Sequence, residues 1–134
     1  MFSISLKNQN ALYVSISTFI LTSVKMNLHK QNFNAISKNV QPYNNFIVDT
    51  INDHCLRMAV MKGEYRWHYH KHTDELFLVL EGELKIEIKD GDTMFLKPGE
   101  FIKIPAGTIH KTSAATRTVN LTFEKNDDDT VFTD

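Results

Sequence analysis

Turn-forming residues recur at short intervals from about residue 45 to residue 124, and this spacing restricts the chain to one class of fold. Short apolar runs are separated by Asn52-Asp53, Asp90-Gly91, Pro98-Gly99 and Pro105-Ala106-Gly107. Turn signals at intervals of roughly 8–12 residues leave room for short strands but not for helices of ordinary length. The pattern therefore predicts an all-β domain, either a sandwich or a barrel.

The run of residues 84–89, Leu-Lys-Ile-Glu-Ile-Lys, alternates strictly between apolar and charged side chains. Such alternation is typical of a strand with one buried face, formed here by the leucine and the two isoleucines. Asp90-Gly91 follows at once and predicts a tight hairpin, because glycine tolerates the positive φ that such turns need. Residues 119–123 predict another strand with one buried face, and only residues 31–38 carry a weak helical pattern.

One predicted strand, residues 75–80, is apolar on both faces. Phe77 and Val79 share a face with Glu75 beside the barrel interior, whereas the leucines of this strand point the other way. Those leucines must be covered by a second sheet layer, by the N-terminal segment or by a second subunit. Of the three, we expect a homodimer with an isologous interface.

Composition narrows the range of partners and compartments. A chain of 134 residues is long enough for one domain with a single core. Its 15 basic and 16 acidic residues nearly balance, and no basic stripe suggests nucleic acid. Cys55 is the single cysteine, which excludes an internal disulfide and predicts a reducing, cytoplasmic location. We expect the Cys55 side chain to act as a small buried hydrophobe. We expect the Asp127–Asp129 run to be a solvated turn.

Residues 11–24 lean apolar but are interrupted by hydroxylated side chains. A membrane span needs roughly 20 apolar residues, so this stretch is too short to cross a bilayer. Lys7 leaves a signal peptide open as an interpretation, although no convincing cleavage site follows. We favour a third interpretation, in which Met26 is the original start. The chain then consists of an N-terminal extension, residues 1–25, that is disordered or not native, and a single domain, residues 26–134.

A second pattern, residues 67–72 (Trp-His-Tyr-His-Lys-His), places its imidazoles on one face of an extended segment. His68 and His70, two residues apart on a strand, are close enough to bind one ion. After a polar bend, Glu75 opens the next strand and can face the same space. His110, which follows a later turn, can supply a third imidazole.

Three neutral imidazoles and one carboxylate suit a divalent transition metal such as Zn, Fe, Ni, Mn or Cu, and argue against a structural zinc held by thiolates. The net charge of such a site is about +1, which favours an anionic or oxygen-rich ligand. An octahedral ion with four protein ligands keeps two open positions. His72 shares the strand face but lies nearer the bend, so we expect it at the rim, with a supporting or proton-shuttle role as the alternative.

Two motifs in these segments resemble those of the cupin superfamily, in particular its small single-domain members. The first motif, a His-x-His pair between two glycines with a glutamate after it, matches Gly63, His68, His70, Glu75 and Gly82. The second matches Gly99, Pro105, Gly107 and His110. Ala114 stands where the second motif ends on an asparagine, which is usually not a ligand. The resemblance covers roughly residues 45–124.

The resemblance implies an all-β, cupin-type jelly-roll β-barrel (a double-stranded β-helix) with a short N-terminal helix or extension. It implies one divalent transition metal inside the barrel, at His68, His70, Glu75 and His110, and a homodimer. We therefore expect a metal-binding cupin that binds or acts on a small anionic or oxygenated molecule, with no nucleic-acid or membrane partner. As an enzyme it would be a metal-dependent isomerase or oxygenase.

Three alternatives stay open. The chain could be a non-catalytic binding or sensing module with a structural metal. It could have sugar-phosphate isomerase-like activity. It could also be a metal-free barrel for an apolar ligand, in which case the four polar positions would tolerate alanine.

Overall fold

The computed structural model describes residues 26–134, so the predicted extension of residues 1–25 lies outside the described residues. Residues from Phe33 to Asp134 form one unit of the chain, to which residues 26–32 do not belong. The unit from Phe33 contains one short helix, α2 (Phe33–Ser37), which falls within the predicted helical stretch. The rest of its regular structure is strand.

Nine strands follow α2 in the described chain. They are β1 (Asn44–Ile51), β2 (His54–Glu64), β3 (His68–His70), β4 (Glu75–Glu81), β5 (Leu84–Ile88), β6 (Thr93–Leu96), β7 (Phe101–Ile104), β8 (His110–Lys125) and β9 (Thr130–Phe132). Every predicted turn between residues 52 and 107 lies between two of these strands. The regular turn spacing therefore predicted the strand content correctly.

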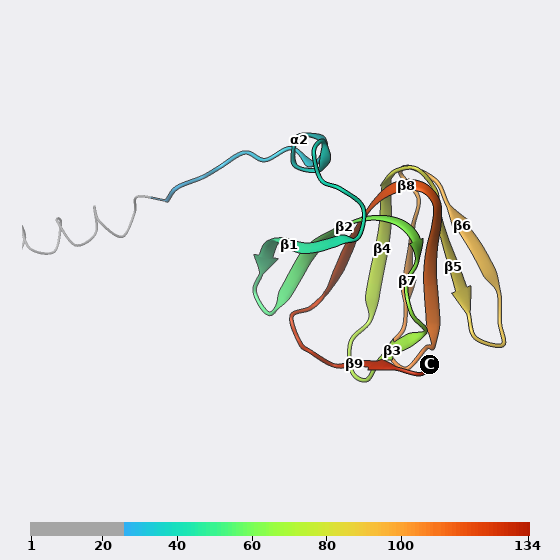
Figure 1. Ribbon diagram of the computed structural model, residues 1–134. Helices are drawn as coiled ribbons and strands as arrows, with labels where there is room; N and C mark the ends of the chain where they lie inside the picture. Colours follow the sequence, from blue (N-terminus) through green and yellow to red (C-terminus); the bar gives the residue numbers. More distant parts are fainter. Residues whose placement is uncertain (1–25) are drawn as a thin grey trace, which may run out of the picture. The chain divides into compact units, whose positions relative to one another are not determined.

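The sheet is antiparallel and is organised around β8, its longest strand (Figure 1). β8 pairs with β5 through residues 110–113 and with β4 through residues 119–124. β2 also pairs with β8, along most of the length of β8. The short strands β3 and β9 pair with each other, and β3 also pairs with the start of β8. Because β4 and β5 pair with different parts of β8 while β2 and β3 also pair with it, the sheet curls back on itself, which confirms the predicted jelly-roll barrel.

The two faces of β4 pack against different apolar clusters, as its sequence requires. One cluster consists of Phe77, Val79, Leu84, Ile86, Leu96 and Ile104. The other consists of Met58, Val60, Val119 and Leu121, with Phe33, Ile36, Phe46, Val48, Leu78 and Leu80 packed against it. The segment before β2, which includes α2 and β1, thus packs in the same cluster as Leu78 and Leu80 on the outer face of β4. Cys55 is 1% exposed, so the prediction of a buried hydrophobe is confirmed.

The hairpin after β5 forms where it was predicted, but a different residue adopts the left-handed conformation. The positive φ of 56° belongs to Asp90, and Gly91 is not in that region. Aspartate visits the left-handed region more readily than most residues because its short polar side chain can bond locally. A Cβ on Gly91 would lie 3.1 Å from Cγ2 of Ile88, so this glycine provides space.

Gly82, between β4 and β5, needs both the conformational freedom and the small size of glycine. Its φ is +81°, and a Cβ at this position would lie 2.6 Å from the carbonyl oxygen of Arg117 on β8. Real Cβ atoms do not approach backbone that closely. The closing glycine of the first motif is therefore required because β8 passes directly over the turn.

Replacing Gly82 with alanine should lower the free energy of unfolding by roughly 2–4 kcal/mol, because a forced positive φ costs about 1–2 kcal/mol and the methyl group collides with β8. Gly99→Ala is the matched control. Gly99 has a φ of +86° and nothing within 4 Å of its Cβ position, so it should lose only about 1–2 kcal/mol. Urea unfolding measures both, and equal losses would show that the approach of β8 is unimportant.

Candidate metal centre

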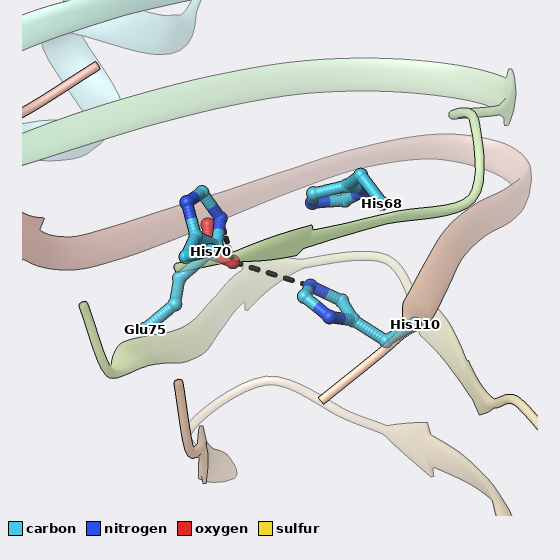
Figure 2. A group of neighbouring side chains, drawn as sticks. All are labelled: His68, His70, Glu75 and His110. Carbon is cyan, nitrogen blue, oxygen red and sulfur yellow. Dashed lines mark hydrogen bonds and ion pairs between the residues drawn. The ribbon is translucent and has the colours of Figure 1, made fainter. Parts of the chain in front are cut away.

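Four buried side chains from three strands converge on one point (Figure 2). They are His68, His70, Glu75 and His110. One ligand atom from each lies within 4.8 Å of the others, and none of the four residues is more than 7% exposed. β3 supplies two of them, and the first residues of β4 and β8 supply the others. All four positions that the sequence predicted as ligands are thus brought together.

Strand geometry explains this convergence. The alternation of β3 directs His68 and His70 to the same side. His68 is the register partner of His110 across β3 and β8, and the centroids of these two rings are 4.3 Å apart. Glu75 comes from β4, where its register partner on β8 is Glu124. The ends of three strands therefore meet at the point where the polar side chains face inward.

Each of the three imidazoles is held by an oxygen atom next to its Nδ1. His68 Nδ1 donates to the carbonyl oxygen of Arg66 and His110 Nδ1 to that of Thr108, both at 2.8 Å. His70 Nδ1 donates to Oδ1 of Asp129 at 3.1 Å. A protonated Nδ1 leaves the lone pair of a neutral imidazole on Nε2. This pattern orients Nε2 for coordination, as partners of metal-bound histidines commonly do.

The contacts of Glu75 test whether this set of side chains fits a cation. Its Oε2 lies 3.1 Å from Nε2 of His70 and 3.3 Å from Nε2 of His110. With Nδ1 already donating, each neutral imidazole would direct a lone pair at a carboxylate oxygen, which is repulsive. A positive species must lie between these atoms, either protons or a metal ion. The donor set therefore fits one divalent transition metal, which would replace the protons.

The pKa values of His70 and Glu75 show which of these groups is charged when protons occupy the space between them. Burial alone would lower the pKa of His70, but hydrogen bonds to Glu75 and Asp129 and the charge of Glu75 outweigh it and raise the pKa to about 9. Burial opposes ionisation of Glu75, yet hydrogen bonds from His110 and His70 lower its pKa. Burial lowers the pKa of His68 and favours its neutral, ligating form. Without a metal, the centre is an ion pair between imidazolium and carboxylate.

Asp129 corrects the prediction that the Asp127–Asp129 run is a solvated turn. Asp127 and Asp128 are exposed, but Asp129 is buried, at 8% exposure. Its Oδ1 accepts from His70 Nδ1, and its Oδ2 accepts from the backbone N–H of His72 at 2.8 Å. Sequence reasoning missed this residue because its partner His70 lies 59 positions away, across the β3–β9 pairing. A polar run at the end of a chain carries no signal of that contact.

His72 lies outside the cluster. Its side chain is exposed, and its backbone amide holds Asp129 in place. It therefore contributes through its main chain to the support of His70, and its imidazole is absent from the lining of the cavities beside the cluster. His54 is partly exposed and pairs with Asp53, away from the cluster.

Two cavities flank the cluster and share His68, Glu75 and Tyr65 as wall residues. The first has a volume of about 290 Å³, and its wall combines apolar and aromatic residues such as Phe77 with polar ones such as Thr112 and Thr122. The second has a volume of about 310 Å³ and is polar. Its wall includes Arg57, Glu124, Asn126, Asp127 and Asp128. His68, His70 and Glu75 therefore form part of the walls of open space and are not sealed in solid packing.

Glu124 is the second carboxylate of this region. Its Oε2 lies 3.9 Å from Nε2 of His70, and its side chain is 14% exposed. Burial and the nearby charge of Glu75 raise the pKa of Glu124 to about 7. The sequence did not single out this residue, because its position on β8 shows no motif.

A curled antiparallel sheet with three histidines and one glutamate in its interior is the architecture that the two motifs predicted. Residues 56–123 match the cupin domain, and the chain belongs to the cupin family. The prediction of a small cupin is thereby confirmed. Among the described residues, no helix is long and apolar enough to cross a membrane.

Similar proteins place the chain among small cupins without fixing a reaction. The uncharacterized protein YdbB of Bacillus subtilis (strain 168) is 49% identical over 102 residues, 75% of this chain and 90% of that protein. Quercetin 2,3-dioxygenase of the same organism is 42% identical over 69 residues, 48% of this chain and only 20% of the enzyme. A cupin-2 domain containing protein from Shewanella frigidimarina NCIMB 400 superposes with a TM-score of 0.66 at 33% identity, over 71% of this chain and 93% of that structure.

Asp129→Asn should weaken the binding of Zn²⁺ by roughly 10- to 100-fold, the usual effect of altering a residue that orients a ligating histidine. The amide has one acceptor oxygen for two donors, His70 Nδ1 and the His72 N–H, and it lacks the charge that supports His70. Competition with a chromophoric chelator measures the affinity. Asp92→Asn, in the exposed hairpin, is the matched control and should bind as the wild type does. Equal affinities of the two variants would remove Asp129 from the support of the site.

The stability of chelator-treated, metal-free protein should depend on pH through His70. Because the pKa of His70 is raised from 6.5 to about 9 in the folded state, its contribution is complete below pH 6.5 and is lost as the pH rises toward 9. Glu75 has a lowered folded pKa, so its contribution is present above 4.5 and is lost as the pH falls below that value. Urea unfolding at pH 6 and pH 9 measures the first effect. Glu75→Gln should reduce this difference, and an unchanged difference would contradict the ion pair.

Proposed function

We propose that this cupin binds one divalent transition metal (Zn, Fe, Ni or Mn) through His68, His70, Glu75 and His110 and acts on a small oxygen-bearing organic molecule. The observation that carries the proposal is the contact of Glu75 Oε2 with two imidazole Nε2 atoms at 3.1 and 3.3 Å. Those atoms repel one another unless a positive species lies between them. The chemical nature of the four donor side chains, their burial and their orientation all favour a metal ion as that positive species.

The chain's own groups define the chemistry. Three imidazoles and one carboxylate give a bound divalent ion a net charge of about +1, so oxygen anions are attracted to it. In the wall of the polar cavity, Glu124, Asp127 and Asp128 outnumber the one cation, Arg57, so the attraction of anions comes from the metal centre itself. Arg57 Nε donates to Asn45 Oδ1 at 2.8 Å and lies 4.0 Å from Glu124 Oε1, which fixes the guanidinium against the wall. The metal, when bound, supplies a Lewis acid that polarises a substrate oxygen.

The two cavities support a ligand-binding centre over a purely structural ion. A structural zinc site is usually closed by four protein ligands in solid packing. Here His68 and Glu75 border open space of about 290 Å³ on one side and about 310 Å³ on the other. A small molecule can therefore reach the donors without rearrangement of the sheet.

Dioxygen chemistry is the reaction class to test first. The relative named quercetin 2,3-dioxygenase is 42% identical to this chain over 69 residues, although the match spans only a fifth of that enzyme. The reaction itself is therefore part of our proposal. A cytoplasmic location, a homodimer and a domain that starts at Met26 stay predictions of the sequence.

Elemental analysis of tag-free protein tests the metal. We expect about one equivalent of a single transition metal in the wild type and in His54→Ala, whose histidine lies outside the cluster. His68→Ala and His110→Ala should lose it, because each removes one of the four donors. A wild type that holds no metal and takes up none on titration would overturn the proposal and leave a metal-free binding module.

Oxygen consumption by the Fe-, Mn- and Ni-loaded protein tests the reaction class, with quercetin and catechol as probes. Uptake by wild type and His54→Ala, lost in His110→Ala, would support an oxygenase. Full metal content without uptake on either probe would favour the non-catalytic alternative, in which the ion anchors a ligand.

A further inference from the structure

A side chain in the wall of the 290 Å³ cavity carries a buried amide oxygen with no hydrogen-bond partner in the described part of the chain. Asn120, on β8, is 2% exposed, and its Oδ1 makes no hydrogen bond with any described residue. Buried amide oxygens are almost always hydrogen-bonded, because an unpaired one has lost its hydrogen bonds to water and has gained none in the protein. An unpaired one that lines a cavity is therefore a feature to explain.

The fold does not need a polar side chain at this position. The register partners of Asn120 are Val79 on β4 and Ala59 on β2, and neither side chain offers a hydrogen bond. Val79 is fully buried within the apolar cluster of the barrel. A leucine of similar size would pack beside these neighbours and leave no atom unpaired. The packing of the sheet therefore does not account for the polar side chain of Asn120.

The cavity provides room for a ligand that could donate a hydrogen bond to this oxygen. Glu75 and His68 of the metal centre line the same space as Asn120, and Phe77, Met61 and Tyr65 supply apolar and aromatic walls. A volume of about 290 Å³ is at the small end of ligand cavities, enough for one ring with a few substituents. The walls thus suit a molecule with an apolar body, an oxygen group at one end and a hydrogen-bond donor elsewhere on its ring.

We propose that Asn120 selects the ligand of this centre: its side-chain oxygen accepts a hydrogen bond from a hydroxyl or N–H group on a ring-sized, largely apolar molecule whose oxygen end lies at His68 and Glu75. The inference rests on the proposed function, because the metal centre anchors the other end of the molecule. It adds the residue that distinguishes a ligand with a donor group from one without. A site built around a buried acceptor rejects analogues that leave the acceptor unpaired.

Binding of aryl hydroxamates to the zinc-loaded protein tests this role, because a hydroxamate binds divalent metals through two oxygens whatever the ring carries. The parent probe is benzohydroxamic acid. The test probes carry a hydroxyl group, which can donate, or a methoxy group, which can only accept, at the 3- or 4-position. Isothermal calorimetry gives each affinity, and elemental analysis of the same samples gives the zinc content.

In the wild type, we expect a hydroxyl group at one of the two positions to improve binding about tenfold over the parent, as one hydrogen bond to a buried acceptor provides. The methoxy probe should show no gain. Asn120→Leu should bind the parent as the wild type does but lose the gain from the hydroxyl group. Asn39→Leu, at an exposed asparagine that lines neither cavity, is the matched control and should keep that gain.

Thermal unfolding separates ligand selection from a structural role. Asn120→Leu should melt at the wild-type temperature or above, because it removes an unpaired buried oxygen, and Asn120→Ala serves as a second variant. A large loss of stability in both would show that the amide supports the fold and would overturn the inference. So would an equal gain from hydroxyl and methoxy groups, or a hydroxyl gain that persists in Asn120→Leu.

The outcomes also separate this inference from the metal proposal. Protein with one equivalent of zinc that fails to bind benzohydroxamic acid would overturn the role of the cavity and leave the metal centre standing. Protein that takes up no zinc would overturn both.

Discussion

The buried carboxylate of Glu75 is the group on which the centre of this barrel depends. A carboxylate removed from water is unfavourable unless positive charge and hydrogen bonds compensate it, and Glu75 is 6% exposed. The compensation comes from His70 and His110, whose Nε2 atoms face Oε2 while their Nδ1 atoms are held by Asp129 and the Thr108 carbonyl. The bonds that make the buried charge tolerable are thus the same bonds that orient the donors toward a cation.

β8 makes this arrangement possible, because one long strand serves several purposes along its length. Its first residue, His110, lies in the centre, and its last part carries Glu124 beside His70. Between them, Asn120 lines the apolar cavity. Since β4 pairs with this part of β8, the position of Glu75 relative to the cavity is set by a continuous register of backbone hydrogen bonds. Rigid strands hold such a site more closely than loops do.

The sequence predicted what depends on local pattern. Turn spacing gave the strands, and the two-residue period of His68 and His70 gave their common face, because side chains on a strand alternate by covalent geometry. It failed where a role depends on a distant partner: Asp129 is buried only because β9 pairs with β3. Asn120 was overlooked for a related reason. Its neighbours Val119 and Leu121 predicted one buried face, whereas β8 is buried on both, so the second face carries information that periodicity cannot show.

Glu75 and Asn120 are both buried polar groups in one cavity wall, and the difference between them separates two roles. Glu75 has two imidazoles against it, so the protein itself balances its charge. The Oδ1 of Asn120 has no hydrogen-bond partner within residues 26–134, and the register neighbours of Asn120 on both sides are apolar. A group compensated by the protein can serve a permanent occupant such as a metal ion. A group left unpaired stays available for a molecule that comes and goes, and its cost to the free protein is recovered only while that molecule is bound.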